Sequence, residues 1–123
     1  MVTKFQDLIC WQKAMELSIA VYSATSNLRD FELKDQLRRA SISTMNNIAE
    51  GFGRKHTKEM SRYLEFSTAS CLEIESMTLL MERLQLLDQE ILADIRNKAV
   101  ETYKVTSGFA KKIKDPTSNN SAK

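Results

Sequence analysis

The chain has 123 residues and a formal net charge of +2, so it has room for one domain with its own core. Only three Gly and one Pro are present, whereas proteins built from strands and tight turns need more of both. Good helix formers dominate the composition. These features exclude a β-rich fold and predict a single all-α domain.

Four helices are predicted, over about 6–28, 32–50, 57–86 and 89–114. In each of them apolar residues recur at alternating spacings of three and four, which is the seam of a helical bundle. The second helix is expected to stop at Gly51, a residue that tolerates the backbone geometry of helix ends. The turn between the last two helices is so short that they must be antiparallel neighbours. The pattern predicts an antiparallel four-helix bundle over 1–114, followed by a disordered tail over 115–123.

The sequence also indicates where the protein resides. The N-terminal segment lacks the basic and apolar stretches of a signal peptide. No window approaches about 18 uninterrupted apolar residues, so no membrane span is predicted. The two cysteines, Cys10 and Cys71, fall at apolar helix positions and match no metal-ligand spacing. We expect a cytoplasmic protein without a membrane partner.

Residues suited to catalysis are scarce. The one histidine, His56, lies in a loop rich in Gly and Lys. The sequence contains no Glu-x-x-His pair, the motif through which some helical bundles hold two metal ions. The run Gly51-Phe52-Gly53-Arg54 follows a helix rather than a strand, so it is not a phosphate-binding loop of the nucleotide-binding type. We therefore predict no enzyme activity, no catalytic residue, no metal and no cofactor.

Charge alternates along the chain. Residues 1–33 carry −1, residues 34–62 carry +4, residues 63–95 carry −6 and residues 96–123 carry +5. One explanation is that oppositely charged helices lie side by side in the bundle. The other is a basic face for nucleic acid or acidic lipid, although the pI of 8.6 is below the value of about 9 that is usual for nucleic-acid-binding domains.

A basic cluster surrounds the loop between the second and third helices. Its guanidinium and ammonium groups could hold phosphates by displacing condensed counterions. Phe52 and Tyr63 are close enough in sequence to stack on an unpaired base. The alternative is a solvated loop that pairs with the acidic third helix. The candidate nucleic-acid-binding residues are Arg38, Arg54, Lys55, Lys58 and Arg62.

A polar ladder follows one face of the second helix. Ser and Asn are poor helix formers, so helix propensity does not explain their presence there. A subunit interface or a binding groove would explain them, and the alternative is simple tolerance at the surface. The ladder, which a helical wheel directs away from the intramolecular seam, comprises Arg39, Ser43, Asn46 and Glu50, with Asn47 at its edge.

Several of these residues carry a family resemblance. The stretch Gln36–Ser43, the run Asn47-Ile48-Ala49-Glu50-Gly51-x-x-Arg54, and Ser70-x-x-Glu73 resemble the signature of the four-helix-bundle proteins encoded in intervening sequences of bacterial 23S rRNA genes. The resemblance covers about residues 5–110. It adds Ser70 and Glu73 to the candidate interface or groove.

The resemblance implies an up-down-up-down bundle, a ring-shaped homo-oligomer that is commonly five-fold, and association with RNA. We therefore expect a non-catalytic, oligomeric protein that binds RNA through its basic loop. The alternative is a homo-oligomeric ring, a pentamer, that serves as a scaffold for protein partners and binds no nucleic acid.

Overall fold

The computed structural model describes residues 2–115, and these form helices without any strand. This confirms the all-α class. A short 3-10 turn precedes four long helices, none of which is long and apolar enough to cross a membrane. The elements are η1 (Phe5–Asp7), α1 (Ile9–Ala24), α2 (Phe31–Phe52), α3 (Thr57–Arg83) and α4 (Gln89–Lys114).

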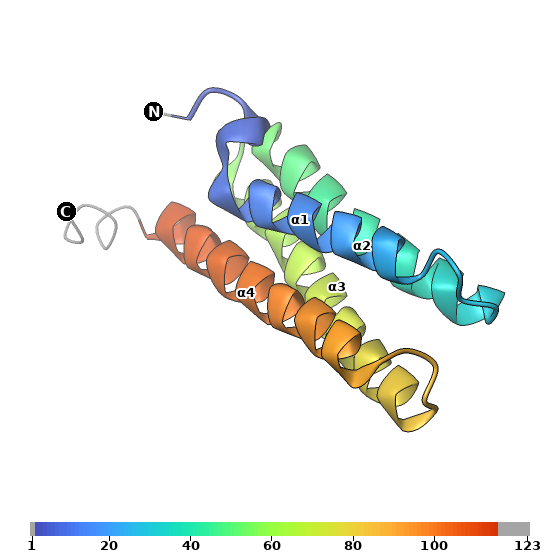
Figure 1. Ribbon diagram of the computed structural model, residues 1–123. Helices are drawn as coiled ribbons and strands as arrows, with labels where there is room; N and C mark the ends of the chain where they lie inside the picture. The colour runs from blue at the N-terminus through green and yellow to red at the C-terminus, as the bar shows by residue number, and fades with distance from the viewer. Residues whose placement is uncertain (1, 116–123) are drawn as a thin grey trace.

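Successive helices run in opposite directions, as Figure 1 shows. Each helix packs against the next, and α1 also packs against α4, so the four helices close into one bundle. This is the predicted antiparallel four-helix bundle. The first and the last described residues lie at the same end of the molecule, together with the loop between α2 and α3 (Figure 1). We call this the terminal end of the bundle.

The core follows the predicted apolar seams. Towards the end opposite the termini, Leu17 of α1, Leu37 of α2 and Leu92 of α4 are completely buried in one cluster. Towards the terminal end, Ile48 and Leu64 are completely buried in a second cluster. Burial of each large aliphatic side chain contributes about 1.5–3 kcal/mol, which explains why the three-four spacing determines the fold.

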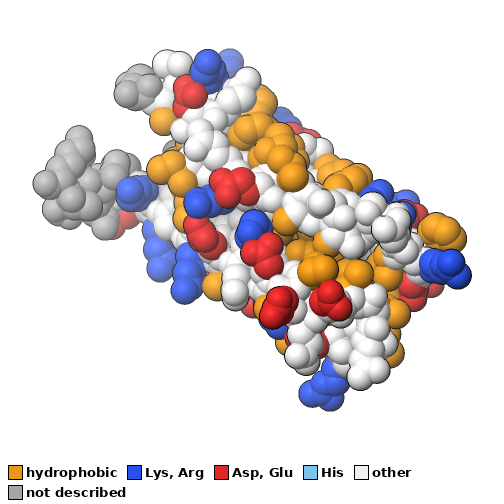
Figure 2. Space-filling model, viewed as in Figure 1, with side chains coloured by type: hydrophobic (Ala, Val, Ile, Leu, Met, Phe, Trp, Pro, Cys, Tyr) orange, Lys and Arg blue, Asp and Glu red, His pale blue; other side chains and the backbone are white. Residues whose placement is uncertain are grey.

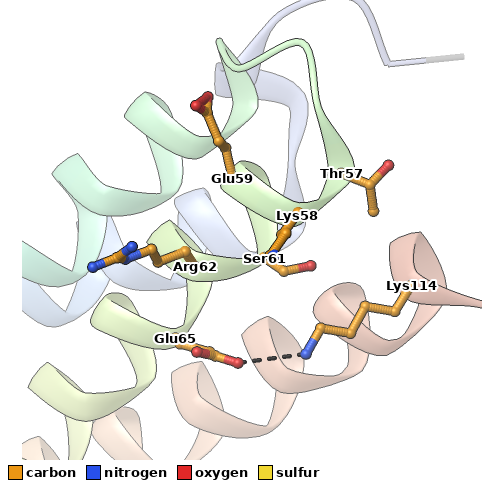
Figure 3. A pocket seen from close by; sticks show the side chains of 7 residues that line it. All are labelled: Thr57, Lys58, Glu59, Ser61, Arg62, Glu65 and Lys114. Atoms are coloured by element: carbon orange, nitrogen blue, oxygen red, sulfur yellow. Dashed lines mark hydrogen bonds and ion pairs between the residues drawn. The ribbon is translucent and has the colours of Figure 1, made fainter.

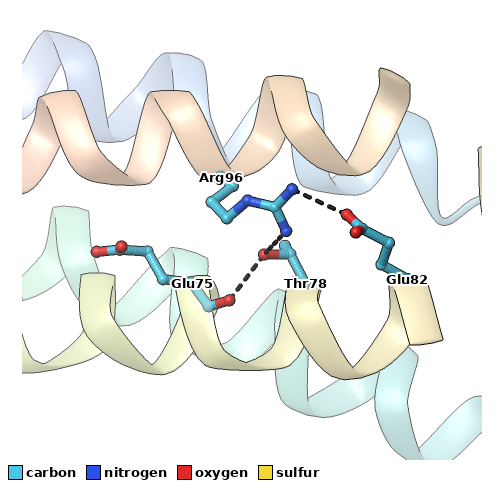
Figure 4. A network of polar contacts seen from close by, with 4 residues as sticks. All are labelled: Glu75, Thr78, Glu82 and Arg96. Carbon is cyan, nitrogen blue, oxygen red and sulfur yellow. Dashed lines mark hydrogen bonds and ion pairs between the residues drawn. The ribbon is translucent and has the colours of Figure 1, made fainter. Parts of the chain in front are cut away.

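Polar contacts link α3 to α4. In Figure 4, Arg96 of α4 reaches both Thr78 and Glu82 of α3. Its guanidinium group donates to the Glu82 carboxylate at 2.9 Å and to the Thr78 hydroxyl at 3.4 Å. Thr78 in turn donates to the carbonyl of Glu75 at 2.8 Å. Part of the charge alternation therefore pairs the acidic α3 with the basic α4.

The first helix is shorter than the predicted 6–28, because this range contains part of η1, the whole of α1 and the non-helical residues 25–28. Leu8 has an extended backbone between η1 and α1. At the other end, Thr25 closes α1 with both its backbone N–H and its hydroxyl donating to the carbonyl of Val21. Apolar residues before and after α1 keep the three-four spacing, and a prediction from this spacing alone therefore placed both ends of the helix too far out.

The second helix runs beyond its predicted end. Gly51 lies inside α2, which ends at Phe52, and no glycine of the described chain has a positive φ. The reason for glycine is the close approach of α3. A methyl group at Gly51 would lie 3.0 Å from Cβ of Tyr63 and 3.2 Å from the carbonyl oxygen of Met60.

The third helix ends three residues before the predicted 86. Gln85 adopts the left-handed conformation with φ 56°. The N–H of Leu86 donates to the carbonyl of Met81 and that of Gln85 to Glu82, which is the Schellman pattern of helix ends. Glycine usually occupies this position, and the glutamine here is no obvious stop signal. The fourth helix has its predicted bounds, and the tail predicted to be disordered lies, apart from Asp115, outside the described residues.

Candidate nucleic-acid interface

Four of the predicted basic residues gather at the terminal end. Gly53 and Arg54 continue from α2 through hydrogen bonds to its last carbonyls, so the chain turns sharply into α3. Arg54, Lys55, Lys58 and Arg62 are all exposed. The loop and the first two turns of α3 therefore present four cations to solvent.

Two arginines lie against aromatic rings beside this loop. The Arg54 guanidinium is 4.8 Å from the ring centre of Tyr63 and donates to its hydroxyl at 2.9 Å. Arg62 lies 5.7 Å from the ring centre of Phe66, and the two rings meet edge to face at 5.9 Å. With Glu59 these four side chains line a cavity of about 300 Å³. Phe52, the other predicted aromatic, does not line it and instead packs against the core.

Arg38 does not belong to this cluster. It lies 14 residues before the end of α2, which is about 21 Å along the helix axis. Its guanidinium group donates to the Thr25 hydroxyl at 2.9 Å and to the Tyr22 carbonyl at 3.2 Å, and it stacks on the Tyr22 ring at 4.2 Å. Arg38 therefore caps α1 at the opposite end of the bundle, because α2 carries it away from the loop.

Three lysines outside the predicted cluster lie at the same end as the loop. Lys111, Lys112 and Lys114 are exposed in the last turn of α4, where they also complement the negative end of the helix dipole. Figure 2 shows basic side chains gathered on the part of the surface where α4 ends. The charge of +5 on residues 96–123 indicated a basic segment, but only the bundle topology places these lysines at the same end as the loop.

The polar ladder divides into two groups. Asn47 donates to the hydroxyl and the carbonyl of Ser43, at 2.9 and 2.8 Å. Ser70 of α3 donates to the Ser43 hydroxyl at 3.0 Å. Ser43 therefore faces α3 of its own chain, contrary to the helical-wheel estimate. That estimate assumed one inner face, whereas α2 packs against both α1 and α3. The remaining predicted residues are exposed: Arg39, Asn46, Glu50 and Glu73.

The cysteines and the histidine belong to no metal site within residues 2–115. Burial raises the pKa of the Cys10 thiol to about 11 and that of Cys71 to about 12. Both cysteines are buried and free. No group of three or more His, Cys, Asp or Glu side chains in this part of the chain could hold a metal. His56 occupies the N-cap position of α3, and its side chain makes no capping bond.

Comparison with known proteins identifies the family. The fold matches a crystal structure from Bacteroides thetaiotaomicron, described as a protein with unknown function from the S23 ribosomal protein family, with a TM-score of 0.79 at 19% identity. The match covers 84% of this chain and 99% of that one. No curated protein matches this sequence. The model of the 23S rRNA-intervening sequence protein family matches residues 6–108. The chain therefore belongs to the 23S rRNA-intervening sequence protein family.

Proposed function

We propose that this protein is a non-catalytic RNA-binding protein that holds single-stranded RNA at the terminal end of its bundle. The observation that carries the proposal is the pair of arginine–aromatic contacts, Arg54 on Tyr63 and Arg62 on Phe66, around a cavity of about 300 Å³. Single-stranded nucleic acid is bound by cations that contact its phosphates and by aromatic rings on which its bases stack. Both kinds of group reach the surface here.

The lysines of α4 support the same proposal. Lys111, Lys112 and Lys114 lie at the end of the molecule that carries Lys55 and Lys58. A strand that leaves the aromatic cavity therefore meets further ammonium groups. Duplex RNA fits less well, because its bases are stacked inside the helix and cannot reach an aromatic ring.

The test is fluorescence anisotropy with a labelled single-stranded RNA over a range of salt concentrations. Lys55→Glu/Lys58→Glu should weaken binding at least tenfold and reduce the salt slope by about 0.7 for each phosphate that the variant no longer neutralises. The matched control is Arg29→Glu/Arg83→Glu, which makes the same charge change at two exposed residues of the opposite end. Equal weakening in both variants would mean that net charge, and not this site, attracts the RNA.

A second test separates stacking from charge. Tyr63→Leu removes the ring but no charge, and it should weaken single-stranded RNA binding several-fold while leaving the salt slope unchanged. Unchanged affinity for this variant, together with a large effect of the lysine variant, would mean that the surface binds RNA by charge alone and that no base stacks on Tyr63.

We also propose that the protein self-associates, as the five-fold ring implied by its resemblance suggests. The supporting observation is an exposed apolar stripe on α3, where Leu72, Leu79, Leu80 and Leu84 are each about half exposed. Exposed apolar surface of this kind usually marks a protein contact. Native mass spectrometry on protein purified without nuclease would give the subunit number and any bound nucleotide mass. A bare oligomer would favour the scaffold function, whereas a monomer would refute self-association.

A further inference from the structure

The first turn of α3 lies beside the last turn of α4 at the terminal end, and a cavity of about 750 Å³ opens between them (Figure 3). It is distinct from the aromatic cavity at Arg54, although the two share Glu59 and Arg62. The hydroxyl and ammonium groups along its wall belong to Thr57, Lys58, Ser61 and Lys114.

Ser61 is the unusual member of this wall. It is 4% exposed, and its hydroxyl has no hydrogen-bond partner within the described chain. Figure 3 shows this hydroxyl directed into the space between Thr57 and Lys114. Buried polar groups nearly always have a partner, since a hydroxyl that loses water without gaining a hydrogen bond is unfavourable. The Ser61 hydroxyl therefore has an unused hydrogen-bonding capacity at the wall of the cavity.

The start of α3 favours an anionic ligand. The first N–H groups of a helix have no acceptor within it, and the helix dipole places partial positive charge at this end. A side-chain cap often satisfies one of these groups, but His56 at the N-cap position makes no such bond. Thr57 lies one turn before Ser61 and also lines the cavity.

The charged side chains around the cavity are compatible with an anion. Lys58 and Lys114 supply two ammonium groups. Lys114 contacts Glu65 at 3.4 Å, but the two side chains are 55% and 66% exposed, so this pair is weak and Lys114 can turn towards a ligand. Glu59 and Glu65 also line the cavity, together with Arg62. In Figure 3 the Glu59 carboxylate is directed away from Lys114, so three cations and the carboxylate of Glu65 are nearest to a bound anion.

We infer that this cavity binds a phosphate group, with the Ser61 hydroxyl donating to one phosphate oxygen and the ammonium groups of Lys58 and Lys114 balancing its charge. The inference rests on the proposed function only for the source of the phosphate. If the protein binds RNA, the bound phosphate group is a phosphodiester of the strand whose bases lie at the aromatic cavity. If it does not, the bound group is free phosphate.

The site is tested by NMR titration of the whole ¹⁵N-labelled protein with inorganic phosphate, against chloride at constant ionic strength and pH. Saturable shifts are expected for the amides of residues 57–61. Ser61→Ala should weaken phosphate binding at least fivefold without lowering the melting temperature, because it removes an unpaired hydroxyl and places a better helix former in α3. The matched control is Ser76→Ala, an exposed serine further along α3, which should bind phosphate as the wild type does. Shifts equal to those with chloride, or unchanged affinity in Ser61→Ala, would overturn the inference.

A parallel titration with single-stranded RNA identifies the source of the phosphate. Loss of affinity for both inorganic phosphate and RNA in Ser61→Ala supports a phosphodiester site. Loss for inorganic phosphate alone supports a site for free phosphate. Should RNA fail to bind the wild type while phosphate binding saturates and depends on Ser61, the proposed function fails and the phosphate site stands.

Discussion

Replacing Gly51 with alanine tests whether α2 and α3 depend on a close backbone approach. Gly51 is buried inside α2, and an added methyl carbon would lie 3.0 Å from Cβ of Tyr63 and 3.2 Å from the carbonyl oxygen of Met60. Neither neighbour is the end of a flexible side chain, so relief of the contact requires α2 and α3 to move apart. Gly108 of α4 provides the matched control, because a methyl group there meets nothing within 4 Å.

Both substitutions gain helix propensity, but only Gly51→Ala adds volume to a packed site. Alanine in place of glycine inside a helix stabilises a protein by about 1 kcal/mol. Extra volume in a packed site costs about 1–3 kcal/mol. We therefore expect Gly108→Ala to stabilise the protein by up to about 1 kcal/mol, and Gly51→Ala to change stability by about 0 to −2 kcal/mol. The difference of about 1–3 kcal/mol between the variants isolates the packing term.

The assay is reversible denaturation in urea and by heat, followed by circular dichroism in the far ultraviolet. For a domain of this size, 1 kcal/mol corresponds to a shift of about 4 °C in Tm, so the two variants should differ by at least that amount. A Gly51→Ala variant that melts with or above Gly108→Ala would refute the close approach as the reason for glycine. In that case the glycine would serve a ligand or a second subunit rather than the fold.

The buried cysteines, Gln85 and Arg38 each give a further prediction. Because burial raises the pKa of Cys10 to about 11 and of Cys71 to about 12, above the ordinary 9.0, the unfolded thiols lose protons first as the pH rises. Stability should therefore fall between pH 9 and about pH 11–12, by up to about 1.4 kcal/mol per pH unit for each thiol. Urea titrations of the Cys10→Ala/Cys71→Ala variant at several pH values should not show this fall in the free energy of unfolding. Gln85→Gly should raise stability by about 1 kcal/mol, because glycine accepts the left-handed conformation without steric cost; an unchanged urea midpoint would contradict this. Arg38→Gln should lower the free energy of unfolding by about 1–2 kcal/mol because the hydrogen bonds of Arg38 to α1 are removed. Its affinity for RNA, measured by anisotropy, should not change. Weaker binding would mean that Arg38 contacts the RNA after all.

The fold could be predicted because it depends on residues whose effect is local and repetitive. Leu17, Leu37 and Leu92 occupy their seams through spacing alone, and their burial is large enough to override irregularities in the loops. The ends of the helices were less predictable, since they depend on single contacts. The end of α1 is set by Thr25 and by Arg38 from another helix, which no local pattern reveals.

The candidate site was predicted only where its residues are neighbours in sequence. Arg54, Lys55 and Lys58 lie within five positions of one another, so their proximity needed no knowledge of the fold. Lys114 joins them only because four antiparallel helices bring the end of α4 beside the start of α3. The partner of Ser43 was missed for the same reason, as Ser70 is 27 positions away.

The topology also decides whether the proposed RNA binding and the proposed self-association would compete for the same surface. In an up-down bundle the starts of α1 and α3 and the ends of α2 and α4 share one end, which here collects the first N–H groups of α3 and the lysines of α4. The exposed leucines lie farther along α3, with Leu79 about 30 Å along the helix axis from Lys58. If both proposals hold, a charge on the leucine stripe, as in Leu79→Lys, should therefore disrupt the proposed oligomer and leave the proposed phosphate binding to each subunit intact. Loss of both properties in that variant would mean that the site is completed by a second subunit.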